Sequence, residues 1–177
     1  MKSFAQFNEA FDSSYKFTGR KIADDQYEYG FDSEYTDPNG KTKKSRIQVD
    51  IVGTENADDD DHYIWEIGFS RATKPSVKKG GRTLMIPSKP SYDVTGGGDA
   101  LKIFSTVMKV AEEFIKKENP KYVSFEAEKP KGSDPKVLAS REKLYLRMSK
   151  KYFGKKFKIT VKSNARSSVF YLDRKGK

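Results

Sequence analysis

Lysine and arginine residues recur along the predicted helix 133–152 at spacings of seven, four and three, which place them on one helix face. That face lies away from the apolar residues of the same helix. Cations gathered in this way bind nucleic-acid phosphates without sequence preference, and such binding weakens steeply with salt. The pattern therefore predicts a nucleic-acid-binding surface; a solvated lysine-rich face is the alternative, because no base-reading motif accompanies it. The predicted binding residues are Lys136, Lys143, Arg147, Lys150, Lys155 and Lys156.

Three consecutive glycines open a second element that could bind phosphate. Gly96, Gly97 and Gly98 lead into Asp99 and Ala100, the start of a predicted helix over residues 99–117. A glycine-rich helix start leaves backbone N–H groups free and presents the positive end of the helix dipole, which suits a phosphate group. These five residues are candidates for holding a phosphorylated cofactor, and a structural helix entry is the alternative.

Much ordinary catalysis is excluded by residue counts. The chain has no cysteine and one histidine, so it has no thiol nucleophile, no cysteine-based zinc site and no cluster of histidine ligands. Four consecutive aspartates, Asp58–Asp61, precede His62, but they lack the alternating spacing of a calcium-binding loop. The segment predicts a solvated hairpin loop, and no metal site is expected.

Charge is distributed unevenly along the chain. Residues 1–70 hold 8 Lys and Arg against 15 Asp and Glu, a net charge of −7, whereas residues 71–177 hold 27 against 10, a net charge of +17. A basic half of this kind suits a polyanionic partner. The sequence has no apolar run long enough to span a membrane and no pattern of a secretory signal, so we expect a protein that is neither secreted nor membrane-bound.

The periodicity predicts one compact domain over residues 19–177, preceded by an N-terminal amphipathic segment, 1–18, whose phenylalanines recur at helical spacing. Alternating apolar residues predict strands, and apolar residues three and four apart predict helices. A basic loop rich in Pro, Gly and Ser separates the third strand from the first long helix, with one short strand expected at 83–86. The predicted strands are 26–35, 45–52, 63–71, 122–128, 157–162 and 169–172, and the long helices are 99–117 and 133–152.

This layout resembles the GNAT acetyltransferase superfamily over about residues 45–172. Gly96–Leu101 is similar to the family's loop that holds the pyrophosphate of acyl-CoA, and Arg141–Tyr145 is similar to its Leu-Tyr element. The resemblance implies an α+β, GNAT-like fold with a central, mostly antiparallel sheet and two main helices. It also implies acetyl-CoA as a cofactor if the protein is an enzyme; otherwise we expect none.

The resemblance assigns catalytic roles to three residues. Tyr145 stands where active family members protonate the leaving thiolate, and packing on the apolar stripe of its helix is the alternative. A general base would be Glu66 or Glu126, both on predicted strands. Asp93 stands three residues ahead of Gly96, where the family pattern has Gln or Arg, so acyl-CoA chemistry is the alternative hypothesis and not the leading one.

The first ten residues, MKSFAQFNEA, resemble capsid-targeting segments of tailed-bacteriophage internal proteins, with Glu9 at the position of the protease cut. The segment from Gly96 to Lys117 and the following Leu-Tyr element also resemble a family of phage proteins. We therefore expect a phage-encoded protein, in the virion or the host-cell cytoplasm, that binds nucleic acid or virion components through its basic C-terminal half. An acyl-CoA-dependent N-acyltransferase and a purely structural virion or adaptor protein are the alternatives.

Overall fold

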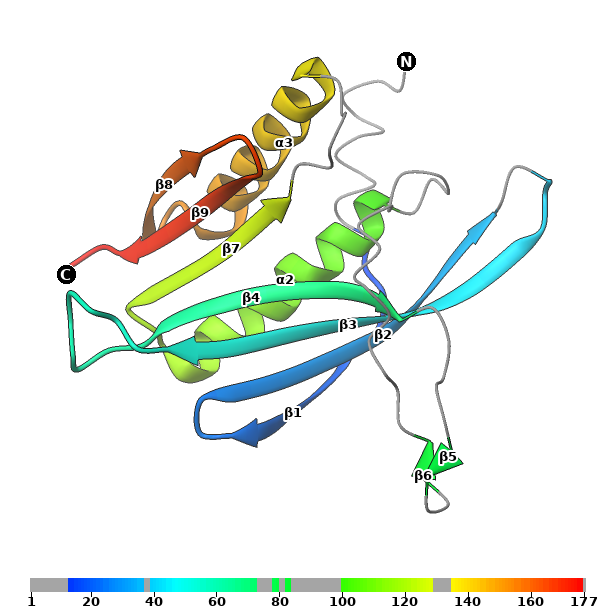
Figure 1. Ribbon diagram of the computed structural model, residues 1–177, viewed down its shortest axis with the longest axis horizontal. Coiled ribbons are helices and arrows are strands. Elements are labelled where there is room, and N and C mark those ends of the chain that lie inside the picture. Colours follow the sequence, from blue (N-terminus) through cyan, green and yellow to red (C-terminus); the bar gives the residue numbers. More distant parts are fainter. Residues whose placement is uncertain are drawn as a thin grey trace. The chain divides into compact units, whose positions relative to one another are not determined.

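The computed structural model describes residues 13–36, 39–72, 78–79, 82–83, 100–128 and 135–176. Two long helices and a series of strands make up these ranges (Figure 1). The strands and helices are β1 Thr18–Ala23, β2 Gln26–Thr36, β3 Thr42–Thr54, β4 Ile64–Ala72, β5 Lys78–Lys79, β6 Arg82–Thr83, α2 Ala100–Glu118, β7 Tyr122–Glu128, α3 Pro135–Phe153, β8 Phe157–Ser163 and β9 Ser167–Arg174.

Seven strands form one mixed sheet in the order β1-β2-β3-β4-β7-β9-β8, and β5 pairs with β6 in a separate two-stranded sheet. Strand β4 runs parallel to β7, with Ile64 opposite Tyr122 and Ile67 opposite Phe125. Strand β9 lies between β7 and β8 and is antiparallel to both. A connection through α2 joins the parallel strands, as parallel pairing requires a long crossover.

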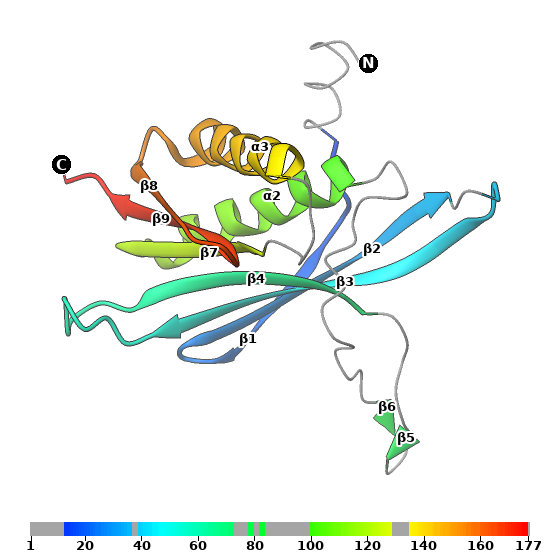
Figure 2. The same cartoon turned by 45° about the horizontal axis from the view of Figure 1, so that its top comes forward.

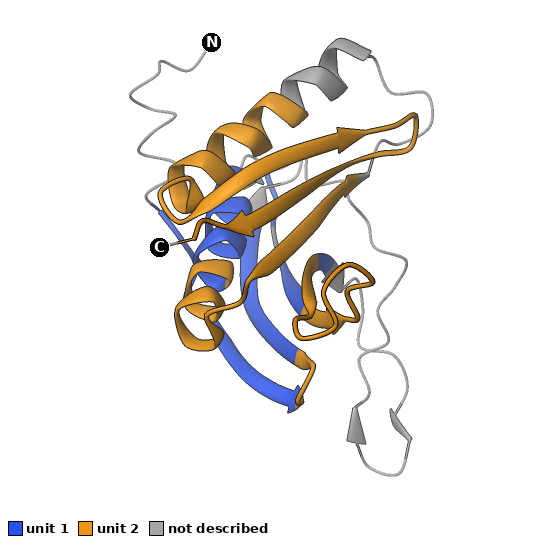
Figure 3. Ribbon diagram, turned by 90° about the vertical axis from the view of Figure 1, so that its left-hand side faces the viewer, with its two compact units in different colours: residues 1–22, 27–50, 69–110 blue, residues 23–26, 51–68, 111–177 orange. Residues whose placement is uncertain are grey.

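The chain divides into two compact units, each assembled from several segments (Figure 3). Unit 1 comprises Met1–Ile22, Tyr27–Asp50 and Phe69–Val110, and unit 2 comprises Ala23–Gln26, Ile51–Gly68 and Ala111–Lys177. The division runs through β3, β4 and α2. The expectation of one domain over residues 19–177 stays a prediction.

Aromatic residues supply much of the core of unit 1, because the alternation along β2 places them on one face. Tyr27, Tyr29 and Phe31 are all buried. The ring of Tyr15 stacks on Phe31 at a centroid distance of 5.7 Å, and its backbone N–H donates to Thr106 Oγ1 at 3.0 Å. These contacts fix the chain that precedes β1 against α2 within the unit. The predicted aromatic stripe of residues 1–12 lies outside the described residues.

The core of unit 2 forms where α2 and α3 pack on the same face of its strands. Trp65 of β4 meets Phe114 of α2 at a centroid distance of 4.9 Å. Phe170 of β9 stacks on Phe125 of β7 at 4.6 Å and meets Tyr145 of α3 edge-on at 6.2 Å. Figure 2 shows α3 beside the strands β8 and β9.

Both helices end through local backbone chemistry. Asn119 follows α2 in a left-handed conformation, with φ at 49°, and its N–H donates to the carbonyl of Ile115. Gly154 follows α3, and a Cβ at this position would lie 2.5 Å from the Lys150 carbonyl oxygen, so the tight end of this helix requires glycine. Neither helix, nor any other in the ranges described, combines the length and apolarity needed to cross a membrane.

Most elements lie within a few residues of their predicted bounds, and β7 matches the prediction at both ends. Strand β1 is an element that the periodicity does not predict. All six of its residues are exposed, so its sequence has no buried face and no alternation to reveal it. The terminal strand pair extends beyond its predicted bounds. Strand β9 begins with Ser167 and Ser168, which are buried in the ladder. The prediction missed them because they are polar.

The expected GNAT-like fold, a mostly antiparallel sheet with two main helices, is wrong. The structure is dominated by a mixed, seven-stranded sheet and has only two helices in the part described, where a GNAT-like sheet would be flanked by helices. Periodicity predicts most of the individual elements, β1 excepted, but not how the strands pair. The balance of strands and helices is compatible with the broader α+β class.

Candidate polyanion-binding surface

Helix α3 is held by its inner face, which fixes where its charged side chains lie. Met148, Ser149 and Phe153 are buried, and Ser149 Oγ donates to the carbonyl of Tyr145 at 2.7 Å. Half-buried Tyr145 packs on Phe170 of the sheet. The residues between these positions must therefore point away from the sheet.

The outer face of α3 carries Lys143, Arg147 and Lys150, all exposed. Their spacing of four and three residues brings them together on the solvent side, as the sequence predicts. Lys150 also lies in the last turn of the helix, where a cation interacts favourably with the helix dipole. Lys136 belongs to the first turn of α3, and its side chain lies outside the described residues.

A short turn after α3 extends this row with Lys155 and Lys156, which are exposed. The N–H of Gly154 donates to the Lys150 carbonyl at 3.0 Å, and the N–H of Lys156 donates to Phe153 at 2.9 Å. Lys175, after β9, donates from its backbone N–H to Lys156 and from Nζ to the Gly154 carbonyl at 2.7 Å. These bonds fix the backbone of the turn, so the two lysines project from a defined position. We call Lys143, Arg147, Lys150, Lys155 and Lys156 the basic surface.

The side chains of the basic surface have no anionic partner in the part of the chain that the structure describes. Within the described ranges, none of the five forms an ion pair or a side-chain hydrogen bond. Elsewhere exposed cations do pair: Lys44 with Glu34 at 2.9 Å, and Arg46 with Asp32 at 3.2 Å. The positive charge of the basic surface is therefore left for an external anion.

Carboxylates are scarce around these cations. Residues 142–176 contain 11 Lys and Arg against two acids, Glu142 and Asp173. Glu142 accepts hydrogen bonds from Ser163 Oγ at 2.6 Å and Ser168 Oγ at 2.5 Å, so its charge is directed toward the β8–β9 hairpin. Asp173 lies opposite Lys158 in the sheet. Sequence reasoning missed the role of Glu142 because its serine partners are more than 20 residues away.

The proposed catalytic residues do not meet. Phe125 and Phe170, which stack on each other, share the helix-covered face of the sheet with Tyr145. Glu126 follows Phe125 on β7 and therefore points to the opposite face, as does Glu66, which pairs with Ser124. The structure thus brings Glu66 and Glu126 to one face and Tyr145 to the other.

The candidate cofactor residues are mostly not described. Gly96, Gly97, Gly98 and Asp99 lie outside the described residues, and Ala100 is the first residue of α2, with its side chain also outside them. Their role in binding acetyl-CoA stays a prediction. No group of three or more metal-ligating side chains is found in the described part of the chain.

The aspartate-rich loop between β3 and β4 is exposed at Asp58, Asp60, Asp61 and His62, and Asp59 is the partly buried member of the run. Asp59 is only 16% exposed in its side chain and accepts hydrogen bonds from Lys121 at 2.6 Å, His62 at 2.9 Å and Tyr122 at 3.1 Å. These bonds, that from Lys121 above all, hold the pKa of Asp59 well below its usual range, and Asp59 in turn raises the pKa of Lys121. Asp59 therefore ties the loop to the start of β7.

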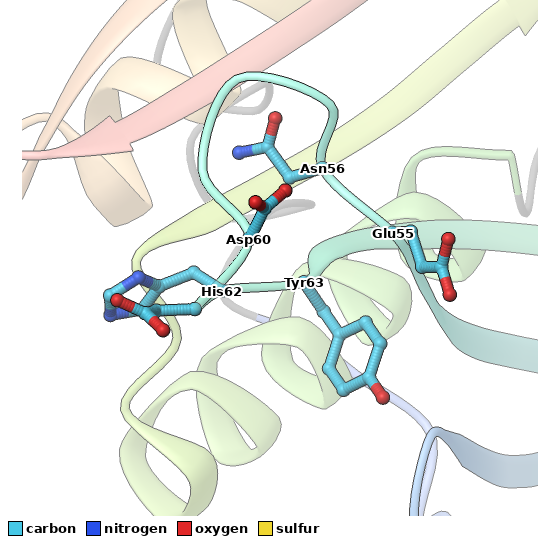
Figure 4. A pocket seen from close by; sticks show the side chains of 6 residues that line it. Glu55, Asn56, Asp60, His62 and Tyr63 are labelled. Atoms are coloured by element: carbon cyan, nitrogen blue, oxygen red, sulfur yellow. The ribbon is translucent and has the colours of Figure 1, made fainter.

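Beside this network the loop encloses an open pocket of about 450 Å³, shown in Figure 4. Its lining is polar and largely acidic, because Glu55, Asp60 and Asp61 contribute to it. The hydrogen bonds of Asn56 shape the loop: its Oδ1 accepts from Asp58 N–H, and its carbonyl accepts from Asp59 N–H. This acidic pocket opposes the binding of anions at this end of unit 2.

Replacing Asp59 with Asn is expected to flatten the loss of stability in acid. The folded-state pKa of Asp59 is depressed, so the carboxylate contributes stability that is fully present above the ordinary aspartate pKa of about 4 and is lost as the pH falls toward the folded-state value. Melting temperatures measured between about pH 6 and pH 3 should fall more steeply for the wild type than for Asp59→Asn. Asp61→Asn, an exposed acid of the same loop, should keep the wild-type slope; a slope equally steep in Asp59→Asn would contradict the role of this network.

Comparisons of the chain with protein-family models, with curated proteins and with solved structures found no match.

Proposed function

We propose that this protein binds nucleic acid through the basic surface of α3 and the turn that follows it. The observation that carries the proposal is the set of five exposed cations that have no anionic partner among the described residues, in a segment whose carboxylate Glu142 is bonded to two serines. A lysine face that contacts only water does not require nearby carboxylates to be bonded to other groups. Binding of this kind neutralises phosphates and releases counterions, without reading the base sequence.

The charge of the whole chain supports the same proposal. A net charge of +10 favours association with polyanions, and the excess lies in the C-terminal half. The acidic loop of β3 and β4 would repel a phosphate backbone from its own end of unit 2 and so favour one orientation of the ligand. The resemblance of residues 1–10 to capsid-targeting segments supports a phage setting, in the virion or the host-cell cytoplasm, where nucleic acid is an abundant polyanion.

Lysine footprinting of the full chain with and without duplex DNA tests this location. An amine-reactive reagent, read out by mass spectrometry, should modify Lys143, Lys150, Lys155 and Lys156 freely in the unbound protein. Saturating duplex DNA at low salt should protect these four lysines several-fold, because their ammonium groups would contact phosphates. Lys16 and Lys44, exposed in unit 1, are internal controls that should keep their reactivity. Uniform protection of all six, or none, would refute the assignment to this surface.

A further inference from the structure

The strands of unit 2 have one face that no helix of the described chain contacts. The helix side is marked by Phe125, Phe170 and Trp65, so their sequence neighbours point the other way. The strand registers align these neighbours across β4, β7, β9 and β8. We call this set the open sheet face: Ile64, Glu66, Tyr122, Ser124, Glu126, Val169, Tyr171, Asp173, Lys158, Thr160 and Lys162.

Tyr171 projects from this face. It is 37% exposed, whereas most large apolar side chains of unit 2 are buried. Its partners across the sheet are Thr160 on β8 and Ser124 on β7, which have short side chains. The phenol ring thus has no bulky neighbour directly opposite it on either adjacent strand.

A cation already lies over this ring. The Nζ of Lys162 is 5.3 Å from the centroid of Tyr171, within the range of a cation–π contact. Lys162 and Lys158 project on the same side of β8, the last strand of the sheet. The pair of ring and ammonium group offers the two features that a nucleotide needs: a π-face for the base and a positive charge for its phosphate.

The acids on the same face determine the orientation of a ligand. Glu66 and Glu126 lie on β4 and β7, toward the middle of the sheet, and Asp173 lies opposite Lys158. A phosphate backbone is repelled by the glutamates and attracted by the lysines of the edge strand. The backbone would follow β8, with bases turned inward over β9.

We propose that Tyr171 and Lys162 form a stacking site for an unpaired base, so that the protein prefers single-stranded to double-stranded nucleic acid. This inference rests on the proposed function, specifies its ligand and adds a second contact, on the face of the sheet that α3 does not cover. A base inside a duplex is already stacked on both sides and cannot lie on a tyrosine ring, whereas unpaired bases stack readily on exposed aromatic side chains. The lysine stem is flexible, which allows its ammonium group to leave the ring for a phosphate when a base arrives.

Fluorescence anisotropy with a labelled oligothymidylate and a labelled duplex of equal length tests the site. Replacing Tyr171 with Ala should weaken binding of the single strand by about tenfold and leave duplex binding within about twofold. Tyr171→Phe should retain single-strand affinity because the ring is kept. Tyr63→Ala removes another exposed tyrosine of unit 2 and should change neither affinity. A Tyr171→Trp variant provides a second readout, since stacking of a base should quench the fluorescence of the new indole.

The outcomes separate this inference from the proposed function. If Tyr171→Ala binds both ligands as tightly as the wild type, the stacking site is wrong while binding through the basic surface stands. Equal loss of single-strand and duplex binding would also overturn it, because the ring would then act through folding or charge. If the wild type binds neither ligand at low salt, both proposals fail.

Discussion

Replacing all five cations of the basic surface with Gln is expected to weaken binding of duplex DNA by about a hundredfold or more at low salt. Each lysine or arginine that neutralises a phosphate contributes through counterion release, and these contributions accumulate over the five side chains. Helix α3 should stay intact, because the replaced side chains are exposed and Gln has a good helix propensity. Fluorescence anisotropy of a labelled duplex measures the change, and circular dichroism checks the fold.

A variant with the same change of charge is the control for this result. Five other exposed cations each pair with a carboxylate of the protein, and replacing them with Gln also lowers the net charge from +10 to +5. That variant should keep its affinity within about threefold, since exposed pairs contribute little and these cations are already neutralised. If both variants lose affinity equally, net charge and not the basic surface governs binding. The control residues are Arg20, Lys44, Arg46, Lys116 and Lys117.

Replacing Phe170 with Ala is expected to lower the free energy of unfolding by about 3–5 kcal/mol. The ring is fully buried between Phe125 and Tyr145, so its removal reduces apolar burial and leaves a cavity where α3 meets the sheet. Urea unfolding followed by circular dichroism measures the change.

The adjacent residue provides a matched control for this stability effect. Tyr171 follows Phe170 on the same strand but points to the open sheet face, and Tyr171→Ala should cost about 1 kcal/mol or less. Comparable losses of stability in the two variants would mean that the helix-covered face of β9 is not the principal core of unit 2. The same pair of variants also separates the stability role of β9 from its proposed binding role.

Local periodicity predicts those elements that have one buried face. Strand β7 alternates clearly and is bounded by Pro120, and α2 repeats apolar residues at three and four until Asn119 ends it. Strand β1 has no buried face, so its sequence carries no such signal. The sheet order depends on pairing between distant segments, such as β9 inserting between β7 and β8, and no local pattern encodes that order.

The features of the candidate site also divide into those that a local pattern predicts and those that only the structure reveals. The spacing of Lys143, Arg147 and Lys150 is a property of one helix and can be predicted from sequence. The bonding of Glu142 to the β8–β9 hairpin, and of Asp59 to Lys121, joins segments far apart in the chain and required the structure. The separation of Tyr145 from Glu66 and Glu126 follows from strand register, which a shift of one residue would reverse.

The salt dependence of duplex binding, compared between the wild type and the five-Gln variant, tests whether the basic surface neutralises phosphates. A plot of log K against log salt concentration should be steep for the wild type. Its slope should be smaller by about 4.5 in the variant, because each of the five phosphates that the variant no longer neutralises accounts for roughly 0.9 of the slope. Such a difference would show that these five side chains bind phosphates. Equal slopes in the two proteins, or wild-type binding that is indifferent to salt, would exclude phosphate binding by the basic surface.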